Sequence, residues 1–150
     1  MLLSMMSSNE SARLERLVVA CHDDRRAFSD AASAHPAHHD ELTQLARRRD
    51  TFIVALEAVL RAHGKEPSRR GSTLAWWNRV TASVRVAVAG ATNMSDTFRS
   101  CVRQESRTLE DFEHAERAGS SSREVAELVQ AQLREIEADL ARVRHLYGWS

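Results

Sequence analysis

The residues of this sequence with the greatest capacity for chemistry are polar side chains that interrupt otherwise apolar helical stripes. They are Asp24 or Arg25, Arg49, Glu105 and Gln132, one position for each of four stripes. At each of these positions the three- and four-residue spacing of the neighbouring apolar residues predicts an inward-facing side chain. Four such residues at similar heights would form one polar layer. We expect Arg49 and Glu105 to form a buried ion pair there, because a lone buried charge is very costly.

A carboxylate di-iron site in a helical bundle takes one Glu from each of two helices and a Glu-x-x-His pair from each of the other two. The sequence does not meet this pattern, since only Asp111-x-x-His114 has a comparable spacing and it has no matching partner. We therefore expect no metal, no cofactor and no catalytic residue, and hypothesise a vestigial or repurposed centre. The alternative is an unconventional iron or manganese site with ligands from Asp24, Glu105, Asp111, His114 and Glu135. It is equally open that the stripe is displaced by one residue and that these groups lie on the surface.

The remaining candidates for chemistry are histidines near a turn and two cysteines. His35, His38 and His39 surround Pro36, where a short His-rich tract could bind a metal but a solvated loop is the simpler interpretation. Cys21 and Cys101 each lie on an apolar stripe and belong to no metal-binding spacing. We expect both to be buried, reduced thiols of a cytoplasmic protein.

The apolar spacing predicts the elements that must position these residues. Residues three and four apart form stripes in four segments, which predict amphipathic helices over about 9–33, 38–63, 95–118 and 122–147. Four helices with one apolar stripe each must pack on one another, which favours a four-helix bundle. We expect a single domain over 9–150 after a flexible N-terminus of residues 1–8, with Met1, Met5 and Met6 as possible starts.

The link between the second and third helices is long, whereas the other two links are short. A link over about 65–94 can run the height of the bundle and gives a one-crossover arrangement. It contains an apolar-rich piece that predicts a short helix. We expect Trp76 and Trp77 to pack this crossover helix against the bundle, although the pair could instead form a platform for a cofactor or partner.

Composition limits the class of protein. The 150 residues carry 21 basic and 21 acidic side chains, so the formal charge of zero argues against nucleic acid as a partner. It gives no reason to expect an anionic membrane surface. No stretch reaches the roughly 20 apolar residues of a membrane span, and the N-terminus lacks the basic region of a secretory signal.

A whole-length pattern of residues runs from about residue 14 to residue 146. It consists of Leu17–Asp24, Arg26–Phe28, Leu45–Arg49, Phe52, Leu56-Glu57, Gly64–Pro67, Gly71-Ser72, the Trp pair, Arg103–Ser106 and Ala141–Leu146. With this pattern the chain resembles a group of bacterial ferritin-like bundles known as domain of unknown function 2383. The resemblance implies a ferritin-like bundle of unassigned activity. The sequence departs from the family pattern at Arg25-Arg26 and Arg48-Arg49, where relatives tend to have glutamates.

The sequence therefore favours a non-catalytic ferritin-like bundle, acting as a stress-related accessory or a protein-interaction module. An unidentified protein or a second copy of the chain would be its partner. Two alternatives remain: a metal-binding protein with oxidase or storage activity, and a binder of small apolar ligands in the bundle core.

Overall fold

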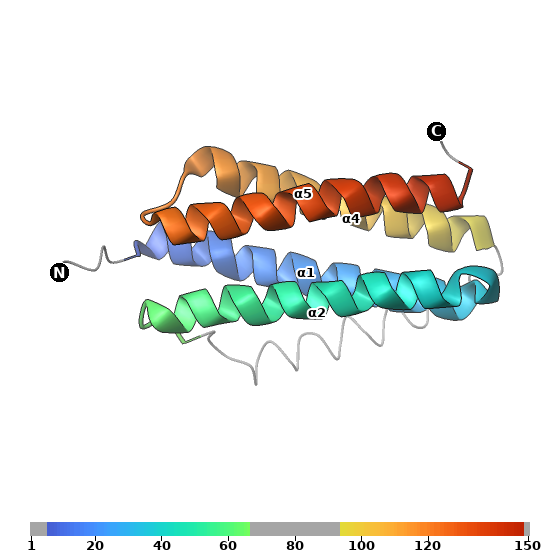
Figure 1. Ribbon diagram of the computed structural model, residues 1–150, viewed down its shortest axis with the longest axis horizontal. Coiled ribbons are helices and arrows are strands. Elements are labelled where there is room, and N and C mark those ends of the chain that lie inside the picture. Colours follow the sequence, from blue (N-terminus) through green and yellow to red (C-terminus); the bar gives the residue numbers. More distant parts are fainter. Residues whose placement is uncertain (1–5, 67–93, 149–150) are drawn as a thin grey trace.

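The computed structural model describes residues 6–66 and 94–148, which form an all-helical structure (Figure 1). In this part of the chain there is no strand, as the sequence predicts. The elements are α1 (Ser8–Ala34), a 3-10 turn η1 (Pro36–His38), α2 (His39–Ala62), α4 (Met94–Ala118) and α5 (Arg123–Leu146). The predicted crossover helix, with Trp76 and Trp77, lies outside the described residues. None of the described helices is long and apolar enough to cross a membrane.

The helix ends follow local capping rules. The Ser7 hydroxyl accepts a hydrogen bond from the Glu10 amide at 3.1 Å, and the Ser122 hydroxyl accepts one from the Val125 amide at 3.2 Å. Each bond satisfies an amide that the first helical turn leaves unpaired. At the other ends, Gly64 and Gly119 adopt positive φ angles of 73° and 78°, which glycine tolerates without strain.

The folded domain begins before the expected boundary at residue 9. α1 starts at Ser8, and the side chain of Met6 is buried in the core. Residues 6–8 therefore belong to the domain and not to a flexible N-terminus. The cap from Ser7 explains the difference, because it lets the helix begin as soon as the chain reaches the apolar core.

The described helices run in two opposite directions (Figure 1). α1 runs antiparallel to α2, because the short turn η1 joins their adjoining ends. α5 also runs antiparallel to α2, and Asp139 pairs with Arg49 between them. α4 runs antiparallel to α1 and to α5, so α2 and α4 are parallel. As a result, the end of α2 and the start of α4 lie at opposite ends of the bundle (Figure 1).

The apolar core consists of two separate clusters. The larger cluster contains Leu17, Phe52, Leu56, Phe112 and Ile136 among other residues, and it fills the half of the bundle that holds the α4–α5 turn. The smaller cluster is built around Phe28, Leu42, Leu45, Cys101 and Val143, and it fills the half that holds the α1–α2 turn. Between them lies a layer of charged side chains.

Candidate functional site

The charged layer is centred on Arg49 of α2, whose side chain is fully buried. Its three nitrogens contact one carboxyl group from each of the other helices. Nε lies 3.1 Å from Oδ2 of Asp24, Nη1 lies 3.0 Å from Oδ2 of Asp139, and Nη2 contacts Oε1 of Glu105. All three carboxyl groups are almost completely shielded from solvent. Each of the four helices thus contributes one charged residue to one point of the bundle.

The environment of Arg49 explains how a guanidinium can occupy the core. Burial of a charge costs several kcal/mol unless partners replace the lost water. Burial lowers the pKa of Arg49, but the adjacent carboxyl groups of Glu105, Asp24 and Asp139 raise it by more, so the side chain stays charged. The guanidinium also lies over two aromatic rings, 5.4 Å from the centre of Phe28 and 4.9 Å from that of Phe52. Cation–π attraction of this kind strengthens in a dry site.

Two further side chains complete the layer from its edges. Arg48 is partly exposed and donates from Nη1 to Oδ1 of Asp139 at 2.6 Å. The buried hydroxyl of Thr108 donates to Oδ1 of Asp24 at 2.5 Å. Both oxygens of Asp24 and both oxygens of Asp139 therefore accept a hydrogen bond. Glu105 differs, because no amide, guanidinium or hydroxyl group among the described residues donates to its Oε2 atom.

The layer perturbs the ionisation of its own carboxyl groups. Burial raises the pKa of Glu105 well above its ordinary value, and the neighbouring charge of Asp24 raises it further. Burial also raises the pKa of Asp24, while its hydrogen bonds with Glu105, Arg49 and Thr108 oppose that effect. The cause is the same in both cases, since a dry interior disfavours the charged form of an acid.

The structure places the predicted layer residues as follows. Asp24, Arg49 and Glu105 meet, and the expected contact between Arg49 and Glu105 is present. Arg25 lies instead on the surface, 3.1 Å from Asp50. Gln132 is buried as expected, but it donates to the Phe52 carbonyl at 3.4 Å and does not touch the charged group.

Sequence reasoning missed three members of the layer: Arg48, Thr108 and Asp139. Asp139 had a usable signal, because it follows Ile136 by three residues and precedes Val143 by four, on the apolar stripe of α5. Thr108 has the same kind of signal, three residues after Glu105 and four before Phe112. Arg48 had none, since its backbone lies on the exposed face and only its long side chain reaches inward.

The alternative metal ligands do not converge in the described residues. His114 and Glu135 are exposed and Asp111 is partly exposed, whereas Asp24 and Glu105 point at the Arg49 guanidinium. Within 6–66 and 94–148, no group of three His, Cys, Asp or Glu side chains is arranged to hold a metal ion. The cation at the meeting point of the carboxyl groups is therefore the protein's own arginine.

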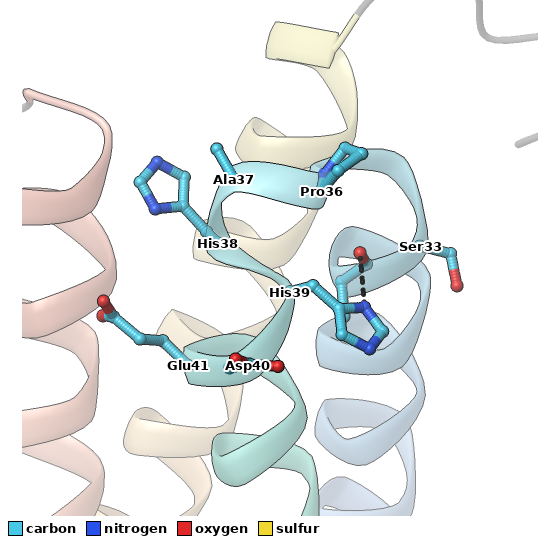
Figure 2. Close-up of a pocket in the computed structure, with 8 residues that line it drawn as sticks. Ser33, Pro36, Ala37, His38, His39, Asp40 and Glu41 are labelled. Atoms are coloured by element: carbon cyan, nitrogen blue, oxygen red, sulfur yellow. Dashed lines mark hydrogen bonds between the residues drawn. The ribbon is translucent and has the colours of Figure 1, made fainter.

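The histidines near Pro36 do not form one cluster. A hollow of about 690 Å³ lies at this turn and is lined by both His38 and His39 (Figure 2). The two rings point to different sides, and Nδ1 of His39 lies 3.1 Å from the Ala32 carbonyl oxygen. His35 is buried and stacks on Phe98, with ring centres 3.6 Å apart.

Both cysteines are free thiols and both are buried. Burial raises the pKa of Cys21 and of Cys101, and the nearby carboxyl groups of the layer add to the effect. A thiol kept protonated in this way is a poor nucleophile. Neither side chain is therefore suited to redox or covalent chemistry in the folded protein.

Comparison with known proteins gives no match. No family model matches the chain, and neither a curated protein nor a solved structure is detectably similar to it.

Proposed function

We propose that this chain is a non-catalytic, ferritin-like bundle in which an ion-pair layer around Arg49 takes the place of a metal centre. It acts in the cytoplasm through contacts with another protein or with a second copy of the chain. The single observation that carries the proposal is that the Arg49 guanidinium lies where carboxyl groups from the other three helices converge. A dication at that point would be repelled by the guanidinium and would compete with it for the same oxygens.

Three further observations support the proposal. The parallel directions of α2 and α4 are those of a bundle with one long crossover. The sequence resembles domain of unknown function 2383 at residues that include Glu105, and it departs from that pattern at Arg25-Arg26 and Arg48-Arg49, where relatives tend to have glutamates. The two free, buried thiols suit a reducing compartment.

Metal content tests the central part of the proposal. Untagged protein is analysed for iron and manganese as purified, and again after anaerobic loading with Fe²⁺ or Mn²⁺ followed by desalting. We expect far less than one metal ion per chain, and no oxygen consumption when Fe²⁺-treated protein meets air. The same metal analysis is made on Arg49→Gln, which removes the central cation. Arg25→Gln is its matched control, because both arginines pair with an aspartate between α1 and α2.

One result would overturn the proposal. Near-stoichiometric metal in the wild-type protein that is lost in Glu105→Ala would identify a metal-binding protein of the oxidase or storage class. In that case the arginine-centred layer would have to rearrange on metal binding. Metal gained only by Arg49→Gln, and not by Arg25→Gln, would instead support the view that the arginine has replaced a metal.

The contact part of the proposal needs a separate test. Val54 on α2 is the one large apolar side chain of the described residues that is highly exposed, at 68%. A photoreactive amino acid at position 54 is therefore placed in the protein inside its source cells, with exposed position 137 on α5 as the control. We expect one defined crosslinked species from position 54, either a second copy or one other protein, and none from position 137.

A further inference from the structure

The charged layer contains more acid than base. Arg48 and Arg49 face three carboxyl groups, those of Asp24, Glu105 and Asp139. If all five groups were ionised, this nearly dry site would hold one uncompensated negative charge, which is very unfavourable. One proton shared within the layer makes it neutral.

The hydrogen bonds indicate where that proton resides. Asp24 accepts from Nε of Arg49 and from the Thr108 hydroxyl, one donor on each oxygen. Asp139 likewise accepts from Arg48 and Arg49 on separate oxygens. Of the three carboxyl groups, that of Glu105 has an oxygen, Oε2, that is buried and receives no donor from the described part of the chain. A carboxyl oxygen without a donor in a dry site is the favoured position for a proton.

The position of two acids on the same guanidinium leads to the same assignment. The carboxyl groups of Asp24 and Glu105 both contact the guanidinium of Arg49, and the charge of Asp24 adds to the effect of burial in raising the pKa of Glu105. Two carboxylates held against one cation in a dry site repel each other, so a proton on one of them is favoured. The arrangement is that of carboxyl pairs that share one proton because like charges cannot be held side by side.

We propose that Glu105 is a neutral carboxylic acid in the folded protein, and that its proton makes the charged layer more stable at lower pH. The titratable groups whose charge acts on Glu105 or is acted on by it are Asp24 and Cys21 on α1, Arg49 on α2 and Cys101 on its own helix, while Asp139 of α5 is linked to it through Arg49. Of these only Arg49 favours the ionised form. This inference rests on the layer alone and does not depend on the proposed function.

The direction of the pH effect follows from linkage. In the unfolded chain Glu105 ionises near its ordinary pKa of 4.5, whereas the folded protein keeps the proton to higher pH. The folded state therefore binds more protons between these two values, and stability falls as pH rises through that window. Glu105→Gln removes the effect, because the amide has nearly the shape of the protonated acid. Its oxygen still accepts from Arg49 and its nitrogen can donate to Asp24.

Two measurements on the intact chain test the inference. The first is the protonated-carboxyl C=O stretching band in the infrared spectrum at neutral pH. The band should be present in the wild type, lost in Glu105→Gln and retained in Glu57→Gln. Glu57 is a suitable control because it is a buried glutamate of α2 outside the layer. The second is urea unfolding of the same three proteins from about pH 5 to about pH 8.

We expect Glu105→Gln to be at least as stable as the wild type at neutral pH. The folding constant of the wild type relative to Glu105→Gln should fall about tenfold per pH unit until Glu105 ionises in the folded state. The difference between the two proteins removes the contribution of Asp23, which is common to both, and reports Glu105 together with its effect on Asp24. Glu57→Gln should show the pH dependence of the wild type.

Either of two results would overturn the inference. One is a wild-type spectrum without the protonated-carboxyl band, or with a band that Glu105→Gln leaves unchanged. The other is a Glu105→Gln protein that is less stable than the wild type by the same factor at every pH, as expected for a broken ion pair. If the variant does not fold, the ¹³C chemical shift of the Glu105 carboxyl carbon in the wild type decides, since it reports protonation directly.

Discussion

Arg49 and Asp139 form a buried ion pair, with Nη1 3.0 Å from Oδ2, between two helices that otherwise touch little. α2 packs extensively on α1 and α4 packs on both α1 and α5, but the contact of α2 with α5 is short. Arg48 adds a second bond to the other oxygen of Asp139. Asp139 is therefore the charged residue of α5 that holds both arginines of α2 at this short contact.

Asp139→Asn should consequently cost more than its change in size suggests. The amide keeps the shape of the side chain but leaves the guanidinium of Arg49 with one charged partner fewer in a dry site. We expect the free energy of unfolding to fall by about 3–5 kcal/mol, measured by urea unfolding followed by circular dichroism.

The control lies on the same helix. Glu127 forms a solvent-exposed ion pair with Arg123 at 2.9 Å, so Glu127→Gln should change stability by less than about 1 kcal/mol. Equal losses in the two variants would show that Asp139 contributes no more than a surface charge.

Arg49→Met should be among the most damaging single changes in the described part of the chain. Methionine approximates the volume but leaves Asp24, Glu105 and Asp139 facing one another without the central cation. Breaking a buried pair in this way costs about 3–5 kcal/mol. Arg25→Met removes an exposed pair on the same helix interface and should cost about 1 kcal/mol or less. Thermal and urea unfolding of both variants measures the difference, and similar midpoints would contradict the central role of Arg49.

Asp23 provides a pH prediction outside the layer. Burial raises its pKa from 3.8 to about 6, and the adjacent charge of Asp24 contributes further. The folded state therefore binds more protons than the unfolded state between these values, so stability contributed by Asp23 declines as pH rises from about 4 to about 6. NMR titration of the Asp23 carboxyl carbon should give a midpoint near 6, and Asp23→Asn should flatten the decline. A midpoint near 3.8 would show that solvent screens this side chain fully.

The thiols should report opening of the bundle. Cys21 and Cys101 are buried, with raised pKa values, so a thiol reagent should modify them only when the helices separate. We expect labelling to be slow in the wild type and much faster in Arg49→Met. Val54→Cys supplies an internal standard, because position 54 is exposed and should react at once. Rapid labelling of the wild type at two sites would indicate that the layer does not hold the helices closed.

The sequence was sufficient to predict the four helices and, for most of the charged layer, which residue of each helix faces inward. Apolar residues three and four apart select one side of each helix, so Arg49 and Glu105 were correctly expected to face inward. The error at Arg25 came from neighbouring polar residues in α1, where periodicity alone left two choices. Packing resolves it, since Asp24 meets Arg49 while Arg25 reaches Asp50 at the surface.

The height of a residue in the bundle was harder to predict than its face. Gln132 and Asp139 lie seven residues apart, which is two helical turns, and so share one face of α5. Periodicity cannot distinguish them. Which of them meets Arg49 depends on where α5 starts relative to α2, and that is set by the turn at Gly119–Ser122 and by packing along α4. The contacts of long side chains such as Arg48 cannot be predicted from periodicity for the same reason.

The division of the core by the charged layer also restricts how the four helices can be aligned. Apolar stripes alone would tolerate a helix that slides along its neighbours by one turn, because leucine, valine and phenylalanine can exchange places at modest cost. Here such a slip would move one of the four charged residues, Arg49, Asp24, Glu105 or Asp139, into the apolar core and leave its partners buried without it. Buried polar residues fix the register of coiled coils in the same way. The charged layer thus fixes the register of all four helices at one height of the bundle.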